Sequence, residues 1–237
     1  MIVNRSIPAA KLKLLIFDLD GTLVDSRIDL ANSINAMLKH LGRPELPPKV
    51  IASYIGDGAP MLVRRSLGDP GEPDSPSEEA GDRLMHDALT FFIAYYREHK
   101  LDNTYVYPGV IEALRKIRRS VNGDRKLAVL SNKPVAPSRQ IVTALGLDEF
   151  FFQVYGGNSF DTKKPDPFGA RILLHEAGAM PEETVIVGDT DIDILTAQNI
   201  GMYSIGCTYG LAPHTLEAAP PDVLVESPLE WIEVLSE

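Results

Sequence analysis

Short apolar runs recur along the chain and are separated by segments with the spacing of amphipathic helices. The runs of strand length cover residues 12–17, 127–130, 151–155, 184–187, 203–207 and 223–225. A strand that is buried on both faces of a sheet reads as a continuous apolar run, so we expect these segments to lie inside one sheet. Between them, residues 110–117, 135–145 and 168–177 have apolar positions three and four apart, which predicts helices. Strands that alternate with helices predict the α/β class with a parallel, doubly wound sheet.

One long stretch near the start of the chain breaks this alternation. Helical spacing covers 29–41, 50–67 and 78–99. A loop rich in glycine and proline occupies 68–76, and no clear strand is present. Long insertions are tolerated in a connection because the cost of closing a loop grows slowly with its length. We therefore expect two domains, a sheet domain of residues 1–24 and 104–237 and an all-helical domain of residues 25–103 inserted into it.

Composition narrows the class of partner. The 237 residues carry a net charge of −10, and the single cysteine, Cys207, excludes a disulfide within the chain. A negative balance argues against nucleic acid and anionic membranes as partners. No run approaches the ~20 apolar residues of a membrane span. We expect a cytoplasmic protein, either a monomer or a homodimer, in which any anion site needs local positive charge or a metal.

The strongest chemical signal lies where the first apolar run ends. The run leads directly into two aspartates, a glycine and a threonine within residues 18–22. Ligands of open α/β sheets bind at the carboxyl ends of the strands, so these carboxylates are expected at the functional edge. Side chains two residues apart in an extended chain point the same way, which would place Asp18 and Asp20 together. The plainer alternative is an acidic turn after a strand.

Two further strand ends carry groups that suit an anion. Ser131 and Asn132 follow one predicted strand, and their hydroxyl and backbone N–H groups could hold phosphate oxygens. Taken alone, such a pair before a helix is usually an ordinary N-cap. The loop after the next strand contains Lys163 and Lys164. The residue before a proline is held extended, which restricts the backbone of Lys164, although exposed loop lysines are the common case.

The strand predicted at 184–187 ends in an acidic turn. Asp189 lies at the strand end, and Asp193 lies one helical turn further along on the same side. Carboxylates at this spacing suit a hard cation, which takes oxygen ligands. Acids also stabilise a helix N-terminus, and we assign Asp191 to that role.

Taken in order, these four strand ends resemble the four motifs of the haloacid dehalogenase (HAD) superfamily of phosphohydrolases. The resemblance covers essentially the whole chain and implies a Rossmann-like core with an inserted helical cap domain. Finer details, at 54–59, 107–110, 131–134, 163–167 and 208–210, resemble phosphoglycolate phosphatases. The resemblance implies a magnesium-dependent, metal-binding hydrolase. Its expected substrate is a small phosphorylated metabolite, 2-phosphoglycolate, which it would split into glycolate and phosphate.

The resemblance also implies a role for each residue of the core motifs. Asp18 is the implied nucleophile, which forms an aspartyl-phosphate, and Asp20 is the implied general acid and base. Mg²⁺ is implied to bind the side chain of Asp18, the backbone carbonyl of Asp20 and Asp189, with Asp193 further out or acting through water. The residues implied to contact the phosphoryl group are Thr22, Ser131, Asn132 and Lys164, with Asp20 as a second possible partner of Thr22. Lys164 is chosen because it directly precedes the proline, as in the family's motif, and Lys163 is the fallback.

In the helical domain the implied assignments concern specificity. The turn at 56–58, which includes Gly58, is the candidate specificity loop. Arg65 on the following helix is the candidate for a bidentate ion pair with a substrate carboxylate, a geometry that arginine favours. Arg64 is the alternative, and a solvated helix face explains Arg64 equally well.

Other functions compete with this one. Within the superfamily they are a phosphatase for another small substrate, a pyrophosphatase, a phosphomutase and a dehalogenase. A dehalogenase does not need a second acid, so Asp20 argues against it. Asp20 and the inserted helices also argue against a non-enzymatic receiver module that accepts phosphate on an aspartate. A binding scaffold with a dead site would have lost motif residues, and none is missing.

Overall fold

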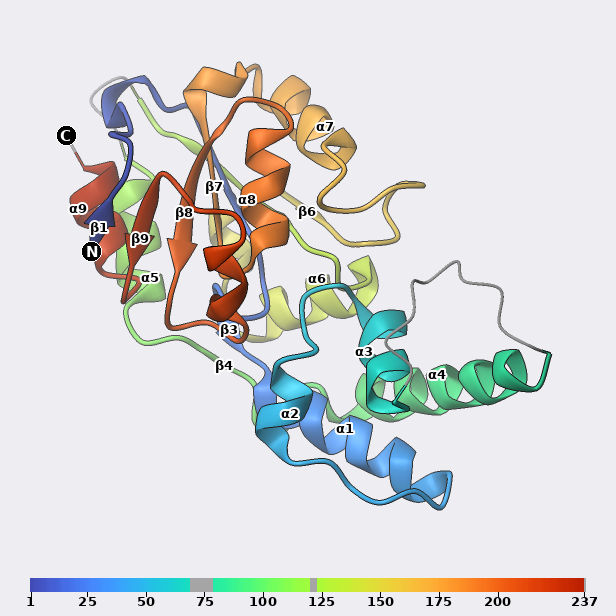
Figure 1. Cartoon of the computed structure of the whole chain (residues 1–237). Helices are drawn as coiled ribbons and strands as arrows, with labels where there is room; N and C mark the ends of the chain where they lie inside the picture. Colours follow the sequence, from blue (N-terminus) through green and yellow to red (C-terminus); the bar gives the residue numbers. More distant parts are fainter. Residues whose placement is uncertain (69–78, 120–122, 237) are drawn as a thin grey trace. The chain divides into compact units, whose positions relative to one another are not determined.

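A seven-stranded sheet organises the larger part of the chain (Figure 1). The computed structural model describes residues 1–68, 79–119 and 123–236. The strands are β1 (Ile2–Val3), β2 (Leu14–Phe17), β5 (Lys126–Leu130), β6 (Gln153–Tyr155), β7 (Thr184–Gly188), β8 (Tyr203–Cys207) and β9 (Val223–Val225). Their order in the sheet is β1-β9-β8-β7-β2-β5-β6. All neighbours pair in parallel except β1 and β9, which are antiparallel.

Strand β2 lies inside the sheet and is paired on both sides. Its four residues are completely buried, as the continuous apolar run predicts. Phe17, its last residue, is in register with Val129 of β5 and with Val187 of β7. The three strands therefore reach the same edge of the sheet together, and the residues that follow them meet there.

Alternate strand residues pack against two helical layers. The helices of this unit are α5 (Val110–Ile117), α6 (Val135–Ala144), α7 (Phe168–Ala177), α8 (Asp191–Gln198) and α9 (Glu230–Leu235). Leu15 and Phe17 share one core with residues of α5, α6 and α9. Leu14 and Ile16 share a second core with residues of α7 and α8. Short 3₁₀ helices lie in the connections, at η1 (Ala9–Lys11), η2 (Asp148–Phe150), η3 (Pro181–Glu183) and η4 (Pro213–Glu217).

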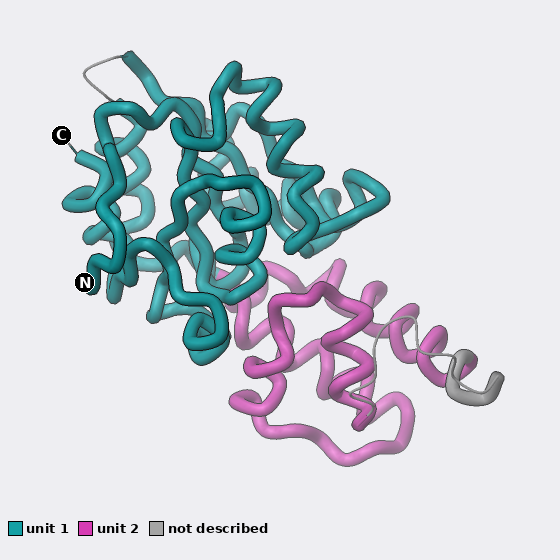
Figure 2. The backbone as a smooth tube through the Cα atoms, turned by 45° about the horizontal axis from the view of Figure 1, so that its top comes forward, with its two compact units in different colours: residues 1–25, 105–237 teal, residues 26–104 magenta. Residues whose placement is uncertain are grey.

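The remaining helices form a second compact unit, Ser26–Thr104, while Met1–Asp25 and Tyr105–Glu237 make up the first (Figure 2). Its helices are α1 (Arg27–His40), α2 (Pro48–Ala52), α3 (Ala59–Ser66) and α4 (Glu79–His99). They enclose a hydrophobic core of their own. The helical unit was expected at 25–103, and it begins and ends one residue later than that. The loop expected at 68–76 lies, apart from residue 68, outside the described residues.

Both connections between the units are tied to each other. In the sheet unit, β3 (Val24–Asp25) pairs with β4 (Tyr105–Val106) in an antiparallel ribbon. In the helical unit, the buried carboxylate of Asp29 accepts two hydrogen bonds from Asn103, at 3.0 and 2.8 Å. It accepts two more from Thr104, at 2.8 and 2.7 Å. Asp29 therefore joins the first turn of α1 to the segment where the chain leaves the helical unit.

The predicted α/β class and parallel sheet are confirmed, with β1 as an antiparallel addition at one edge. Most predicted ends of strands and helices differ from the observed ones by no more than two residues. The helical spacing at 50–67 corresponds to two helices, α2 and α3. A turn separates α2 from α3, and Gly58, with a φ of 87°, lies at the N-cap of α3. Strands β1, β3 and β4 were missed because two residues leave no periodic pattern. None of the described helices is long and apolar enough to span a bilayer.

Replacing Trp231 of α9 with alanine should destabilise the sheet unit. Its ring is fully buried and its centroid lies 5.3 Å from that of Phe17. Truncation removes this packing and leaves a cavity, so the free energy of unfolding should fall by about 3–5 kcal/mol. Chemical denaturation followed by circular dichroism measures the change, because the only tryptophan fluorophore is lost. The control, Met180→Ala at an exposed site, should change it by less than about 0.5 kcal/mol. Equal effects of the two variants would contradict this role of Trp231.

Candidate active site

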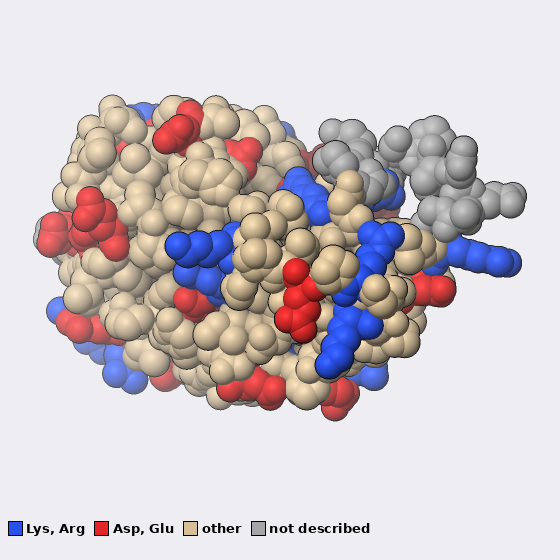
Figure 3. Space-filling model, turned by 60° about the horizontal axis from the view of Figure 1, so that its bottom comes forward, with Lys and Arg blue, Asp and Glu red and all other residues tan. Residues whose placement is uncertain are grey.

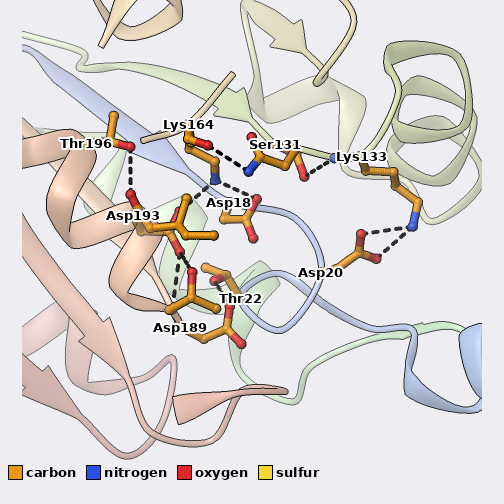
Figure 4. Close-up of polar contacts among 12 residues, drawn as sticks. Asp18, Asp20, Thr22, Ser131, Lys133, Lys164, Asp189, Asp193 and Thr196 are labelled. Carbon is orange, nitrogen blue, oxygen red and sulfur yellow. Dashed lines mark hydrogen bonds and ion pairs between the residues drawn. The ribbon is translucent and has the colours of Figure 1, made fainter. Parts of the chain in front are cut away.

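Three aspartates converge at the edge where β2 and β7 end (Figure 4). Asp18 follows β2, Asp189 follows β7, and Asp193 lies in the first turn of α8. One carboxylate oxygen of each lies within 4.8 Å of those of the other two. The three residues are 9%, 1% and 0% exposed, respectively. The level ends of β2 and β7 bring Asp18 and Asp189 together, and the first turn of α8 adds Asp193.

Lys164 reaches this cluster from the loop between β6 and α7. Its Nζ atom donates to Oδ1 of Asp18 at 2.9 Å and to Oδ1 of Asp193 at 2.6 Å (Figure 4). Burial alone would lower the pKa of Lys164, but the charges of Asp18 and Asp193 raise it above its ordinary value, so the ammonium form is stabilised. Lys163 is exposed, so the structure brings Lys164, the residue before the proline, to the acids.

The cluster carries more negative charge than Lys164 balances. Burial raises the pKa of Asp18 to about 6, although the Lys164 ammonium acts in the opposite direction. Burial, followed by the charges of Asp18 and Asp193, raises the pKa of Asp189 well above its ordinary value. Within the described residues, the ion pairs of these three aspartates are those that Lys164 makes with Asp18 and Asp193. Such a site favours an additional cation.

The loop after β8 holds Asp189 through backbone groups. Oδ2 of Asp189 accepts from the N–H of Leu211 at 2.7 Å and from the N–H of Ala212 at 3.3 Å. From the same loop, the hydroxyl of Tyr209 donates to the carbonyl of Thr22 at 3.0 Å. Sequence reasoning missed the two supports of Asp189 because any residue type can offer a backbone donor. The only signal was the resemblance of 208–210 to phosphoglycolate phosphatases.

Two glycines allow the backbone to approach Asp189 closely. Gly21 has a φ of +88°, and a Cβ atom there would lie 2.2 Å from Oδ2 of Asp189. A Cβ atom on Gly210 would lie 2.2 Å from the Cβ atom of Asp189. The hydroxyl of Thr22 also faces this carboxylate, 3.4 Å from Oδ1, which is a long hydrogen bond. The glycine of the first motif is therefore needed for contact with the fourth.

Ser131 and Asn132 lie directly after β5 and are buried at the same edge. Nδ2 of Asn132 donates to the carbonyl of Lys164 at 3.0 Å, so the two turns are joined. Oγ of Ser131 accepts from the N–H of Lys133 at 3.3 Å. Both residues lie where the strand pattern predicts, and their contact with a phosphoryl group stays a prediction.

Asp20 lies outside the cluster of three carboxylates, although its charge is among the causes that raise the pKa of Asp18. Its two carboxylate oxygens accept from Nζ of Lys133, at 3.1 Å for Oδ1 and 2.9 Å for Oδ2. Figure 4 shows this pair apart from Asp18 and Lys164. The reason is that β2 ends at Phe17, so the alternation of an extended strand does not continue through the turn. Lys133 belongs to the motif at 131–134, but the sequence pattern assigned it no role.

In the helical unit, Arg65 is engaged with its own turn. Its guanidinium forms an ion pair with Asp57 at 2.6 Å and donates to the carbonyl of Tyr54 at 3.2 Å. These contacts fasten the turn that leads to Gly58 and α3. Arg64, the alternative candidate, is partly exposed. Contact of either arginine or of Gly58 with a substrate stays a prediction.

Comparison with known proteins places the chain in a family. The haloacid dehalogenase-like hydrolase family matches residues 15–207. The chain is similar to the phosphoglycolate phosphatase of Chromobacterium violaceum, with 37% identity over 226 residues that cover 94% of this chain and 96% of that protein. It is also similar to the phosphoglycolate phosphatase of Neisseria meningitidis, with 37% identity over 223 residues, or 92% of each chain.

A solved structure agrees with these relatives. The crystal structure of a predicted phosphoglycolate phosphatase from Haemophilus somnus has a TM-score of 0.84 to this chain. The two share 31% identity, and the match covers 94% of this chain and 98% of that one. The family match spans all four strand ends that meet at the acidic cluster. This chain belongs to the haloacid dehalogenase-like hydrolase family.

Proposed function

We propose that this protein is a Mg²⁺-dependent phosphatase that hydrolyses 2-phosphoglycolate to glycolate and phosphate. The observation that carries the proposal is the buried cluster of Asp18, Asp189 and Lys164 at the carboxyl edge of the sheet. The family and the relatives at 37% identity make the chain a hydrolase of phosphoric monoesters. The names of those relatives support phosphoglycolate as the substrate.

The donor set fits a divalent metal ion. The residues in reach offer carboxylate oxygens, which hard cations prefer, and their buried negative charge exceeds that of one lysine. Asp18 and Asp189 would hold the ion together with the backbone carbonyl of Asp20. Both oxygens of Asp193 are already engaged, one by Lys164 and the other by Thr190, so we place Asp193 outside the direct ligands. When bound, the ion neutralises charge on the phosphoryl oxygens.

In the first half-reaction Asp18 is the nucleophile. Lys164 holds Oδ1, and in the described parts of the chain Oδ2 accepts no hydrogen bond. An oxygen of Asp18 forms a bond to phosphorus while the bond between phosphorus and the ester oxygen breaks. Asp20, in its protonated form, gives its proton to that oxygen. The products are the free alcohol, the aspartyl-phosphate on Asp18 and the carboxylate of Asp20.

In the second half-reaction water attacks the phosphorus of the aspartyl-phosphate. Asp20 takes one proton from this water, phosphate leaves, and the carboxylate of Asp18 and the protonated form of Asp20 are restored. Lys164 and the turn at Ser131 would hold phosphoryl oxygens through both steps. Local positive charge of this kind explains how an acidic chain could bind an anion.

The remaining parts of the proposal concern the helical unit and the partners. The unit Ser26–Thr104 would act as a cap domain that excludes water from bound substrate, with Arg65 as the candidate partner of the glycolate carboxylate. On the face in Figure 3, acidic and basic side chains are interspersed among uncharged ones. A small phosphorylated metabolite is the proposed partner, with no nucleic acid and no membrane. A cytoplasmic location and a monomeric or dimeric state belong to the same proposal.

Asp18→Asn should abolish turnover and leave the fold intact. The amide is a poor nucleophile, so kcat should fall by about 10³-fold or more. The measurement is phosphate release in the presence of Mg²⁺ over a panel that includes 2-phosphoglycolate, pyrophosphate and p-nitrophenyl phosphate. Substantial activity of this variant would overturn the nucleophile assignment. A wild-type preference for pyrophosphate would overturn the substrate assignment.

Mg²⁺ should raise the unfolding temperature of the protein, because a ligand that binds only the native state stabilises it, by about 2.7 kcal/mol at 100 times Kd. Asp189→Asn removes one proposed ligand and should lose most of this shift in a thermal melt. Chelation should lower the activity of the wild type by about 10²-fold or more, and added Mg²⁺ should restore it. Turnover that survives chelation would contradict the metal site.

Arg65→Ala should raise KM for 2-phosphoglycolate by about 10-fold, because the bidentate ion pair with the substrate carboxylate is lost. KM for 2-hydroxyethyl phosphate, which replaces the carboxylate with a hydroxymethyl group, should change by less than about twofold. Steady-state kinetics on both esters measures the difference. Arg64→Ala, measured in parallel, separates the two candidates, and an equal change for both esters would remove either arginine from carboxylate recognition.

A further inference from the structure

A second ion pair lies at the same sheet edge as the acidic cluster, and the reaction steps described above give it no role. Nζ of Lys133 contacts both carboxylate oxygens of Asp20, at 3.1 and 2.9 Å (Figure 4). The side chains of Lys133 and Asp20 are only 6% and 10% exposed. A pair this far from solvent is not a loose surface contact, and it suits the carboxylate form of Asp20 that the first half-reaction produces. The contact with both oxygens also fixes the plane of the Asp20 carboxylate.

Contacts with neighbouring residues hold the backbone of Lys133 in place. Its carbonyl accepts from the N–H of Gly157 at 2.8 Å, and its own N–H donates to Oγ of Ser131 at 3.3 Å. A Cβ atom on Gly156 would lie 2.5 Å from the same carbonyl, so the neighbouring loop packs directly on it. Pro134 follows, and a proline restricts the backbone of the residue before it. The side chain of Lys133 therefore extends from a backbone whose position is constrained.

The two acids of the first motif thus have different lysine partners. Asp18 is paired with Lys164, whereas Asp20 is paired with Lys133. The side chain of Asn132 donates to the carbonyl of Lys164, which links the turns that carry both lysines. The separation matters because the attacking and leaving oxygens of a phosphoryl transfer lie roughly in line on opposite sides of phosphorus. A proton donor for the leaving oxygen has to be directed away from the nucleophile.

We propose that Lys133 is a positioning residue that orients the Asp20 carboxylate toward the leaving-group side of the phosphoryl centre. This inference rests on the proposed phosphatase function. Lys133 itself touches neither phosphorus nor the leaving oxygen. Without it, the carboxylate of Asp20 can rotate about its side-chain bonds, and proton transfer loses the alignment on which its efficiency depends.

The test is Lys133→Met, which keeps the length of the side chain and removes its charge and donors. Three esters are compared by kcat/KM, which reports the steps up to cleavage of the ester bond: 2-phosphoglycolate, 2-hydroxyethyl phosphate and p-nitrophenyl phosphate. The first two release poor leaving groups that need a proton, whereas p-nitrophenolate leaves without one. We expect a fall of about 10-fold or more for both alkyl esters and less than about threefold for p-nitrophenyl phosphate.

Other patterns overturn the proposal and identify what Lys133 does instead. A fall for 2-phosphoglycolate alone would make Lys133 a ligand of the substrate carboxylate. An equal fall for all three esters would make it a phosphate ligand or a purely structural residue. An unchanged or increased rate for the alkyl esters would also contradict the proposal. If the wild type hydrolyses none of the esters, the proposed function fails and takes this inference with it.

A double-mutant cycle keeps the test valid if Lys133→Met folds poorly because Asp20 is left unpaired. Asp20→Asn together with Lys133→Met removes both charges and should fold as well as Asp20→Asn alone. In this background Lys133→Met should change kcat/KM for the alkyl esters by less than about twofold, since the group it orients is gone. An additive loss would overturn the proposal. Lys116→Met, at an exposed lysine paired with Glu112, is the matched control and should leave all three rates unchanged.

Discussion

The arrangement of the site depends on the stabilisation of buried negative charge. Asp18, Asp189 and Asp193 place their carboxylates within 4.8 Å of one another, and Lys164 balances only part of their charge. An unpartnered buried charge costs several kcal/mol. The chain offsets this cost with the Lys164 ammonium, with backbone N–H groups on Asp189 and, under the proposed function, with a dication. Under the proposed function, the excess charge that would repel a phosphate by itself would bind the cation that attracts it.

The geometry of the sheet brings these charged residues together. The register of β2 with β5 and β7 brings three strand ends level, so residues distant in the chain must share one edge. The buried apolar strands supply the stability that allows such a cluster to persist. Because Gly21 and Gly210 have no side chains, the backbone at both positions can lie close to Asp189. Packing energy from the two cores thus holds together groups that repel one another electrostatically.

The extent to which the sequence predicted this site follows from the same physics. Asp18 and Asp189 could be placed in advance, because buried apolar runs define where strands end and parallel strands share an edge. Lys164 was chosen over Lys163 by its resemblance to the motif, in which the lysine directly precedes the proline. Asp20 could not be placed, since its direction depends on torsion angles within a turn that no residue pattern specifies. The supports of Asp189 from Leu211 and Ala212 were invisible because they are backbone groups. The pair of Arg65 with Asp57 was missed because partly exposed charges have many possible partners.

The direction of Asp20 has a chemical meaning that the expected arrangement would have lacked. Two carboxylates side by side would repel each other and would both face the same side of a phosphoryl group. In-line displacement needs one on each side, the nucleophile facing phosphorus and the proton carrier facing the leaving oxygen. Under the proposed function, separate lysines would meet this need, since Lys164 attracts Asp18 toward Asp193 while Lys133 attracts Asp20 toward the turn after β5. Because Asn132 joins the two lysine-bearing turns, a shift of one acid relative to the other would have to break that hydrogen bond or bend the sheet edge that both turns follow.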